Sequence, residues 1–485
     1  DNLRETTVES FMKKIVSAAG MAALGVVGLH AAAGDGLTRM EASKPWSLKA
    51  NLRGFYDDNV FTTPDNGFRS YYANAGGAQG AIDPATGQVT AFGQRTFKPV
   101  SSYGIEIQPS ATFNLVTDQS LLSLGYQYGH RWYEDRPGRS ADQSHVFDVS
   151  LTHDLDPLTS ISFGDNFTLA QEPEIVDTAT VLRPNNQQGN LTAEQPFRAN
   201  LDSIHNKAFL SLDRGLSQTL SAHVGYQFDI YQYADDGYDG SFSSRLDRNQ
   251  HQVNLHLAAQ IADPTTVLLG YQFRNVAFTS SDDLGYIANG TYLVEADSRD
   301  TDTHVVFVGA SHAFSPELQT SARAGAQFVS YTGVSSDHPY DLDDSQTSPY
   351  VDINASYSYY EGSSITAGVK HERNQTDLAL IAGGQALDQE TTSIYASLNH
   401  RLTSRITASA VGLYSMNRFD DSARSLGDDD YFSLGLNANY LINQYLSAEL
   451  GYNFDDLDSA LQDQLGNELR SFSRNRVYVG LRASY

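Results

Sequence analysis

The chain has 485 residues, with 32 basic and 58 acidic side chains, so its net charge is −26, and it contains no cysteine. This acidity argues against nucleic-acid binding, because a protein that contacts phosphates needs a concentrated basic face. A mean hydropathy of −0.38 argues against a bundle of transmembrane helices. The 28 Tyr and 23 Phe argue against a disordered chain, which would be poor in aromatic residues.

One long apolar run lies near the start of the chain. Lys13 and Lys14 precede the apolar segment 15–29, and the small residues 31–33 follow it. This order of a basic segment, an apolar core and small residues is typical of a cleaved export signal, whereas a membrane anchor would need a longer core. We therefore expect an upstream extension without a fold over 1–11, a signal peptide over 12–33 and a short periplasmic segment over 34–46.

From residue 47 onward, apolar residues alternate with polar or small ones, as in β-strands with two differently solvated faces. In the first such segment Leu48 and Leu52 share one face, and Lys49, Asn51 and Arg53 share the other. Eighteen segments follow this pattern, over 47–57, 100–116, 121–133, 144–154, 158–170, 204–213, 217–231, 249–261, 266–279, 303–314, 318–331, 348–360, 363–372, 392–401, 405–416, 430–441, 445–455 and 474–485.

The connections between these segments alternate between short turns and long polar stretches. Eight are tight turns, such as Leu155-Asp156-Pro157 and Asp263-Pro264, and nine are longer and rich in Gly and Asp. Turns at one end and loops at the other are typical of an outer-membrane barrel, whereas a soluble sandwich would mix the two. The sequence predicts an all-β fold, a transmembrane antiparallel up-and-down β-barrel of about 18 strands over 47–485, with its long loops outside the cell.

A weak repeat carries aromatic residues in the same phase. Gly-Tyr-Gln or Gly-Tyr-Asn followed by an aromatic residue occurs four times, each six to eight residues after a short turn. We expect an aromatic girdle at the membrane interfaces. Its members would be the repeat tyrosines Tyr126, Tyr226, Tyr271 and Tyr452, with Trp132 at the top of a strand and Trp46 at the foot of the first.

The last ten residues alternate perfectly and end on an aromatic side chain. In this phase Val479, Leu481 and Tyr485 face lipid. The segment resembles the terminal strand signal that the barrel-assembly machinery of Gram-negative outer membranes reads, although Phe is the more usual last residue there.

The first strand and its exit carry a family resemblance. Residues 54–61, Gly-Phe-Tyr-Asp-Asp-Asn-Val-Phe, and the following Thr-Pro-Asp-Asn at 63–66 resemble the opening of outer-membrane porins called β-barrel porin 2. Some members of that family are encoded with exopolysaccharide synthesis genes. The resemblance implies an outer-membrane barrel of poorly defined substrate and supplies no catalytic residues.

Closure of the barrel would bring charged residues of the first and last strands together on the inner wall. Lys49, Arg53, Arg476 and Arg482 form a basic patch there, and neighbouring strands add Glu106 and Glu449 to the same face. Such groups can orient polar solutes and filter ions, or they can act as salt bridges that hold the seam. Both readings stay open at this point.

Other polar groups give weaker signals. The acidic runs Asp235-Asp236, 341–344, 428–430 and Asp455-Asp456 fall in expected loops, where solvation is favoured over binding of divalent cations. His145, His153, His371 and His400 fall near strand ends on the lipid-facing phase, so interfacial packing is favoured over metal binding. A barrel enzyme that acts on lipids needs a Ser or Asp and a His converging on one rim, and no such pairing stands out in the sequence, so we expect neither an enzyme nor a cofactor or metal site.

The sequence predicts a porin-like channel of the bacterial outer membrane for passive diffusion of small hydrophilic solutes. An exporter in exopolysaccharide secretion and a surface or adhesion barrel with a plugged lumen are the alternatives. Expected partners are outer-membrane lipid, the barrel-assembly machinery and small solutes or polysaccharide. A homo-oligomer is left open, and nucleic acid is not expected.

Overall fold

The computed structural model describes residues 45–63, 68–70, 94–96, 99–171, 202–287, 291–340, 342–381, 384–420, 425–461 and 470–485. Its main element is a sheet of 18 antiparallel strands. These strands are β1 (Trp46–Asp57), β4 (Ser102–Val116), β5 (Ser120–Tyr133), β6 (Ala141–Asp156), β7 (Thr159–Gln171), β8 (Asp202–Gly215), β9 (Leu220–Tyr233), β10 (Arg248–Ala262), β11 (Thr265–Phe278), β14 (Thr301–Ala313), β15 (Leu318–Tyr331), β16 (Ser345–Tyr360), β17 (Ser363–Asn374), β20 (Asp388–Arg401), β21 (Ile406–Asp420), β22 (Ser425–Asn443), β23 (Leu446–Ser459) and β24 (Phe472–Ser484).

The sheet closes on itself because β1 pairs with both β4 and β24. Across the closing seam Lys49 lies opposite Ser484, and Asp57 opposite Arg476. Closure leaves no free edge in this sheet of 18 strands, so each of them has a partner on both sides, as a membrane-spanning sheet requires. The predicted fold class, an 18-stranded antiparallel barrel, is confirmed.

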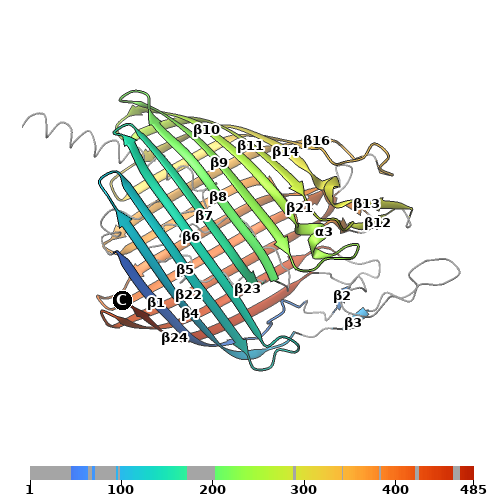
Figure 1. The fold of residues 1–485 in the computed structure, drawn as a ribbon, viewed down its shortest axis with the longest axis horizontal. Coiled ribbons are helices and arrows are strands. Elements are labelled where there is room, and N and C mark those ends of the chain that lie inside the picture. Colours follow the sequence, from blue (N-terminus) through green and yellow to red (C-terminus); the bar gives the residue numbers. More distant parts are fainter. Residues whose placement is uncertain are drawn as a thin grey trace, which may run out of the picture.

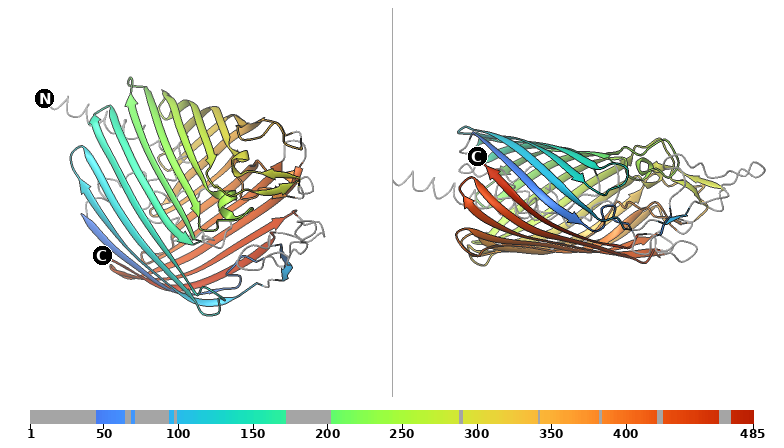
Figure 2. Two further views of the ribbon diagram at one scale, coloured as in Figure 1. Left: turned by 45° about the vertical axis from the view of Figure 1, so that its right-hand side comes forward. Right: turned by 90° about the horizontal axis from the view of Figure 1, so that it is seen from below.

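The two ends of the barrel differ as the sequence predicts (Figure 1). Eight short turns, from 117–119 to 444–445, lie at the end where Tyr485 lies. At the other end the longer connections carry small elements: β2 (Phe68–Ser70), β3 (Gln94–Thr96), α3 (Phe242–Leu246), β12 (Gly285–Ile287), β13 (Tyr292–Val294), η3 (Ala296–Arg299), β18 (Leu380–Ile381) and β19 (Gly384–Gln385). Figure 2 shows that the barrel is flattened, being narrower when seen from below.

The strand alternation separates an apolar outer face from a polar inner face. On β1, Leu48 and Leu52 point outward and are 50% and 51% exposed, whereas inward-pointing Arg53 is 2% exposed. Outward leucine and valine would be unfavourable in water, and they gain stability in the hydrocarbon core of a bilayer. Among the described residues, no helix is long and apolar enough to cross a membrane.

The structure corrects two details of the sequence interpretation. β22 and β23 extend further than expected, so the acidic runs 428–430 and Asp455-Asp456 lie within strands and not in loops. The connection between β21 and β22 shrinks accordingly to 421–424. The expected extension (1–11), signal peptide (12–33) and most of the segment 34–46 lie outside the described residues.

Candidate functional site

The inner wall is more accessible at the turn end than at the loop end. On β24, Arg482 and Ser484 are partly exposed, whereas Arg476 and Tyr478, nearer the loops, are buried. On β1 the same change occurs between Lys49, which is partly exposed, and Arg53. The boundary between the accessible and the buried part of the wall thus lies between Lys49 and Arg53 on β1 and between Arg482 and Tyr478 on β24. A solute entering from the turn end would meet the side chains at this boundary first.

An ion-pair network lies at this boundary, across the seam. Glu106 on β4 accepts hydrogen bonds from Arg53 (Nη1–Oε2, 3.3 Å), Arg476 (Nη2–Oε2, 3.1 Å) and Arg131 (Nη2–Oε1, 2.9 Å). Glu449 on β23 accepts from Arg53 (Nε–Oε1, 2.5 Å) and Arg482 (Nη2–Oε2, 3.3 Å). Two carboxylates thus bridge four arginines contributed by β1, β5 and β24.

The network keeps a positive excess and an accessible edge. Its four arginines and two glutamates have a formal charge of 4 − 2 = +2, and the buried carboxylate of Asp57 on β1, opposite Arg476, offsets part of it. Arg53, Arg476 and both glutamates have side chains no more than 2% exposed, whereas those of Arg131 and Arg482 are 20% and 21% exposed. Only these two arginines can meet a solute directly, because the other charges are covered by their neighbours.

The structure therefore brings together Arg53, Arg476, Arg482, Glu106 and Glu449, the main part of the patch expected from the sequence. Lys49 lies on the same inner face, opposite Ser484 and Ser110. Arg131 was not predicted from the sequence. The strand alternation could have identified it, because its neighbour Trp132 points outward and Arg131 must therefore point inward. The register that places it opposite Glu106 is a property of the sheet.

Further buried ion pairs line the wall away from the seam. Arg373 Nη1 lies 2.6 Å from Asp388 Oδ1, Lys370 Nζ lies 2.5 Å from Glu372 Oε1, and Arg474 pairs with Asp455. Pairing is required here because an isolated buried charge is costly. The sequence reading singled out none of these pairs, since the partners of Arg373 and Arg474 come from other strands.

At the loop end, the guanidinium of Arg299 joins three loops. Its side chain is fully buried and donates to the carbonyl oxygens of Arg245 (2.9 Å) and Thr376. Burial, together with the nearby charges of Arg248 and Arg245, lowers the pKa of Arg299 to about 9. Arg470 continues the cluster by donating to Asp377 Oδ2 at 2.9 Å. Loops that follow β9, β11, β17 and β23 are thus tied together above the lumen.

The expected girdle aromatics all lie on the outer face. Trp46, Tyr126, Trp132 and Tyr226 are 38% to 48% exposed, and Tyr271 and Tyr452 are partly exposed. The glycine of the repeat faces inward, and at Gly451 it leaves room for an aromatic ring of the neighbouring strand. A Cβ at Gly451 would lie 2.0 Å from the ring of Tyr478, so only glycine lets this ring lie flat across the strand.

The last strand has the phase that the sequence predicts. Val479, Leu481 and Tyr485 are 62%, 46% and 63% exposed on the outer face. Arg482 points inward between Asn51 and Glu449, donating from Nε to Asn51 Oδ1 at 3.0 Å.

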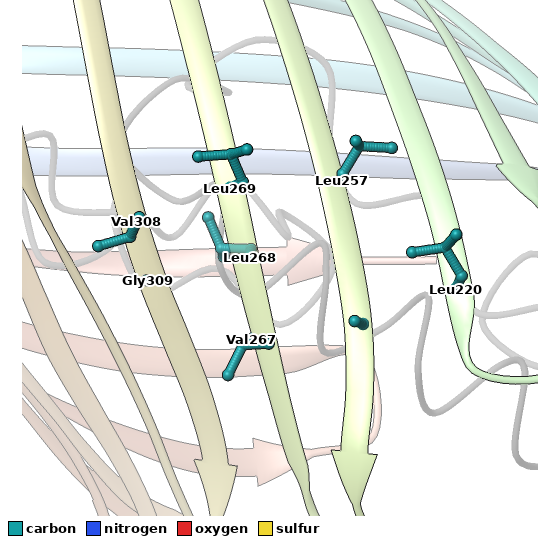
Figure 3. Close-up of a pocket in the computed structure, with 8 residues that line it drawn as sticks. Leu220, Leu257, Val267, Leu268, Leu269, Val308 and Gly309 are labelled. Carbon is teal, nitrogen blue, oxygen red and sulfur yellow. The ribbon is translucent and has the colours of Figure 1, made fainter.

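No group of three or more His, Asp or Glu side chains within the described ranges is arranged to hold a metal ion. A pocket in the wall formed by β9, β10, β11 and β14 is lined by aliphatic residues and glycine, among them Leu257, Leu269 and Val308 (Figure 3). None of its lining residues has a polar side chain that could bind a hydrophilic solute.

Comparison with known proteins gives one family match. Residues 389–485 match the family described as "Putative beta-barrel porin 2". This range runs from β20 to β24 and does not include residues 54–66, which carried the resemblance in the sequence. No curated protein matches the chain.

The chain is also similar to solved barrel structures. OccAB2 of Acinetobacter baumannii is 7% identical with a TM-score of 0.43, over 91% of this chain and 98% of that one. A BenF-like porin of Pseudomonas fluorescens Pf-5 is 10% identical with a TM-score of 0.39, over 91% and 99%. The FrpB iron transporter of Neisseria meningitidis (F3-3 variant) is 10% identical with a TM-score of 0.40, over 91% and 82%. These are distant likenesses.

The closed 18-stranded barrel, its apolar outer face and the family match agree with one another. The family expected from the sequence matches residues 389–485, and the protein is a β-barrel of the bacterial outer membrane.

Proposed function

We propose that this barrel is a channel for passive diffusion of small hydrophilic solutes. The observation that carries the proposal is the positively charged edge of the seam network, where Arg131 and Arg482 are partly exposed on the inner wall. Charges that line a narrow lumen act on a solute at close range and favour ions of the opposite sign. Small anionic or polar solutes are the substrates that this wall suits best. They would pass through the barrel chemically unchanged.

Conductance across a planar lipid bilayer tests this function. The purified barrel should give stepwise, ohmic currents in potassium chloride. Persistent silence of correctly folded protein would reject the channel and favour a surface or adhesion barrel with a plugged lumen. That second candidate has its own support, because Arg299 and Arg470 tie loops together above the lumen and the loop half of the seam wall is buried.

An alternative transport function is export of a secreted polysaccharide, which the family resemblance at residues 54–66 suggests. A channel that passes only small solutes would conduct potassium chloride and exclude long glycans. Blockage of the current by a purified acidic polysaccharide added on the turn side would favour the exporter.

The proposal includes insertion by the barrel-assembly machinery through the last strand. The support is its lipid-facing phase, with Val479, Leu481 and Tyr485 exposed on the outer face. Assembly rates of terminal-strand variants in outer-membrane vesicles test this part, and cross-linking in the same vesicles would reveal any homo-oligomer.

A further inference from the structure

The aromatic repeat builds a recurring hydrogen-bonded unit with the next strand. In three of its copies the tyrosine hydroxyl contacts a histidine Nδ1: Tyr126 with His145 at 3.0 Å, Tyr226 with His251 at 2.8 Å and Tyr271 with His304 at 2.8 Å. The aromatic residue two positions after the tyrosine packs on the same imidazole, as Phe228 does on His251 at 4.7 Å between ring centroids.

The fourth copy shows how the unit is polarised. There Tyr452 donates to Asn475 Oδ1 at 2.6 Å, while Asn475 Nδ2 donates to Asp58 Oδ2 at 2.8 Å. By analogy, a histidine whose Nδ1 accepts the tyrosine O–H carries its proton on Nε2 and donates outward. Each unit therefore presents one outward N–H.

Where the protein supplies a partner for such an outward nitrogen, that partner is a carboxylate. Asp58 accepts the hydrogen bond from Asn475 Nδ2. At His371, Nδ1 contacts Thr392 Oγ1 at 2.8 Å, and Nε2 lies 2.9 Å from Glu390 Oε1. Within the described part of the chain, Nε2 of His251 and of His304 has no protein partner. These two donors are left for an anionic oxygen from outside the protein.

The histidines mark the edges of the apolar band. On β14, His304 and His312 enclose the outward residues Val306, Val308 and Ala310. Eight residues at ~3.3 Å each along a strand tilted by about 40° span roughly 20 Å, close to an apolar band of ~25 Å. His251 and His304 lie at the loop-side edge, which is the level of the outer-leaflet head groups when the turns face the periplasm.

An apolar groove lies below these two histidines on the same strands. Its outward walls are Leu257 on β10, Leu269 on β11 and Val308 on β14, which are 47%, 54% and 61% exposed (Figure 3). Leu269 is two residues below Tyr271 along β11. The floor includes Ala259, whose small side chain leaves the space between larger neighbours.

We propose that the outer face of β9, β10, β11 and β14 binds one phosphorylated lipid of the outer leaflet. His251 lies opposite Asn275 and His304 opposite Phe273, so they flank β11 with an offset of two residues. Two strand spacings of ~4.8 Å and an offset of ~6.6 Å place them about 12 Å apart. Their Nε2 atoms donate to phosphate oxygens of the head group, and an acyl chain occupies the groove. The fit combines two N–H donors that face an anionic head group with an apolar surface at the depth of the acyl chains.

Native mass spectrometry of the detergent-solubilised barrel tests the proposal, with bis-phosphorylated lipid A and its dephosphorylated form as the two probes. Wild-type protein should retain one bis-phosphorylated molecule and bind the dephosphorylated form roughly tenfold less, because hydrogen bonds to a charged group are lost. The H251F/H304F variant should lose the preference. Equal retention of both lipids by the wild type would overturn the proposal.

Two further variants separate head-group recognition from general folding defects. H145F removes the same tyrosine-paired imidazole on β6, away from the groove, and should bind as the wild type does. A259F fills the groove from the lipid side and should reduce binding while keeping His251 and His304. Unchanged binding by both H251F/H304F and A259F, each shown to be folded by its heat-modifiable migration, would likewise overturn the proposal.

Discussion

The indole ring of Trp46 stacks on the phenol ring of Tyr485, with ring centroids 5.2 Å apart and planes inclined by 30°. Backbone hydrogen bonds between Leu48 and Tyr485, at 2.9 and 3.1 Å, run in both directions beside this contact. The foot of the first strand and the end of the last strand thus close the seam at the turn end, where both rings are exposed to the interface.

We expect the ring of Tyr485, more than its hydroxyl, to support closure. Deleting Tyr485 should slow assembly and remove the stacking, which is worth about 0.5–1.5 kcal/mol for an aromatic pair. Tyr485→Phe should assemble like the wild type, because the ring is kept. Assembly kinetics in lipid vesicles, followed by heat-modifiable migration, check this. If Tyr485→Phe were as slow as the deletion, the hydroxyl would be the essential part.

The outer phase of β24 should dominate its insertion. Leu481 lies on the outer face between Leu52 and Ala448, so Leu481→Arg should lower the free energy of unfolding by ~2–4 kcal/mol if it lies near the membrane midplane. Arg482→Gln, one residue further on the inner face, should leave folding intact, because Glu449 keeps its hydrogen bond from Arg53 Nε at 2.5 Å. Urea unfolding in vesicles compares the two variants. Equal stabilities would contradict the strand phase.

Glu106 should be more important for stability than any exposed carboxylate. It holds Arg53, Arg131 and Arg476, so Glu106→Gln leaves buried guanidinium groups without their counter-charge. Removing one partner of a buried ion pair costs about 3–5 kcal/mol. Glu361→Gln is the matched control, because its carboxylate is 88% exposed beside Arg401. Urea midpoints that shift equally in both variants would argue against the network.

The accessible arginines should set charge selectivity. Neutralising Arg131 and Arg482 to Gln should shift the reversal potential in a salt gradient toward cation preference, because both face the inner wall. Arg139→Gln, on an exposed loop next to Asp202, should have little effect, since salt screens loop charges within ~10 Å. If the double variant conducts normally with an unchanged reversal potential, the arginines only hold the seam.

Asp300, outside the apolar band, should make the loop before β14 sensitive to pH. Burial and the charges of Asp297 and Asp302 raise its pKa from 3.8 to about 6, although Asp300 accepts a hydrogen bond from the Phe278 N–H at 2.7 Å. The protonated form is therefore favoured on folding. The associated stability is complete below about pH 4 and is lost as the pH rises through about 6.

Asp300→Asn should remove this dependence, because the amide oxygen can still accept the Phe278 N–H. The variant should be more resistant to proteolysis of this loop than the wild type at pH 8, and the two should converge near pH 4. Asp337→Asn, in the exposed loop before β16, serves as the control. A wild-type loop that is cleaved at the same rate at both pH values would contradict the prediction.

The sequence alone determined the strand count, the position of the eight turns and the inward or outward phase of the first and last strands. These features depend on neighbouring residues: the two-residue alternation seen in Leu48 and Lys49, and turn residues such as Asp263 and Pro264. The membrane location followed from the same alternation. The family match over residues 389–485 and the closed barrel agree with that reading.

Only the tertiary structure decided which charges meet. Arg131 reaches Glu106 through the register of β4 and β5, and Arg299 reaches Thr376 through the convergence of two loops. The continuation of β22 through Asp428 to Asp430 likewise depends on pairing with β21 and β23, which compensates for the low strand preference of aspartate. Register, loop contacts and strand ends are set by partners far away in the chain, and an alternating pattern carries no information about them.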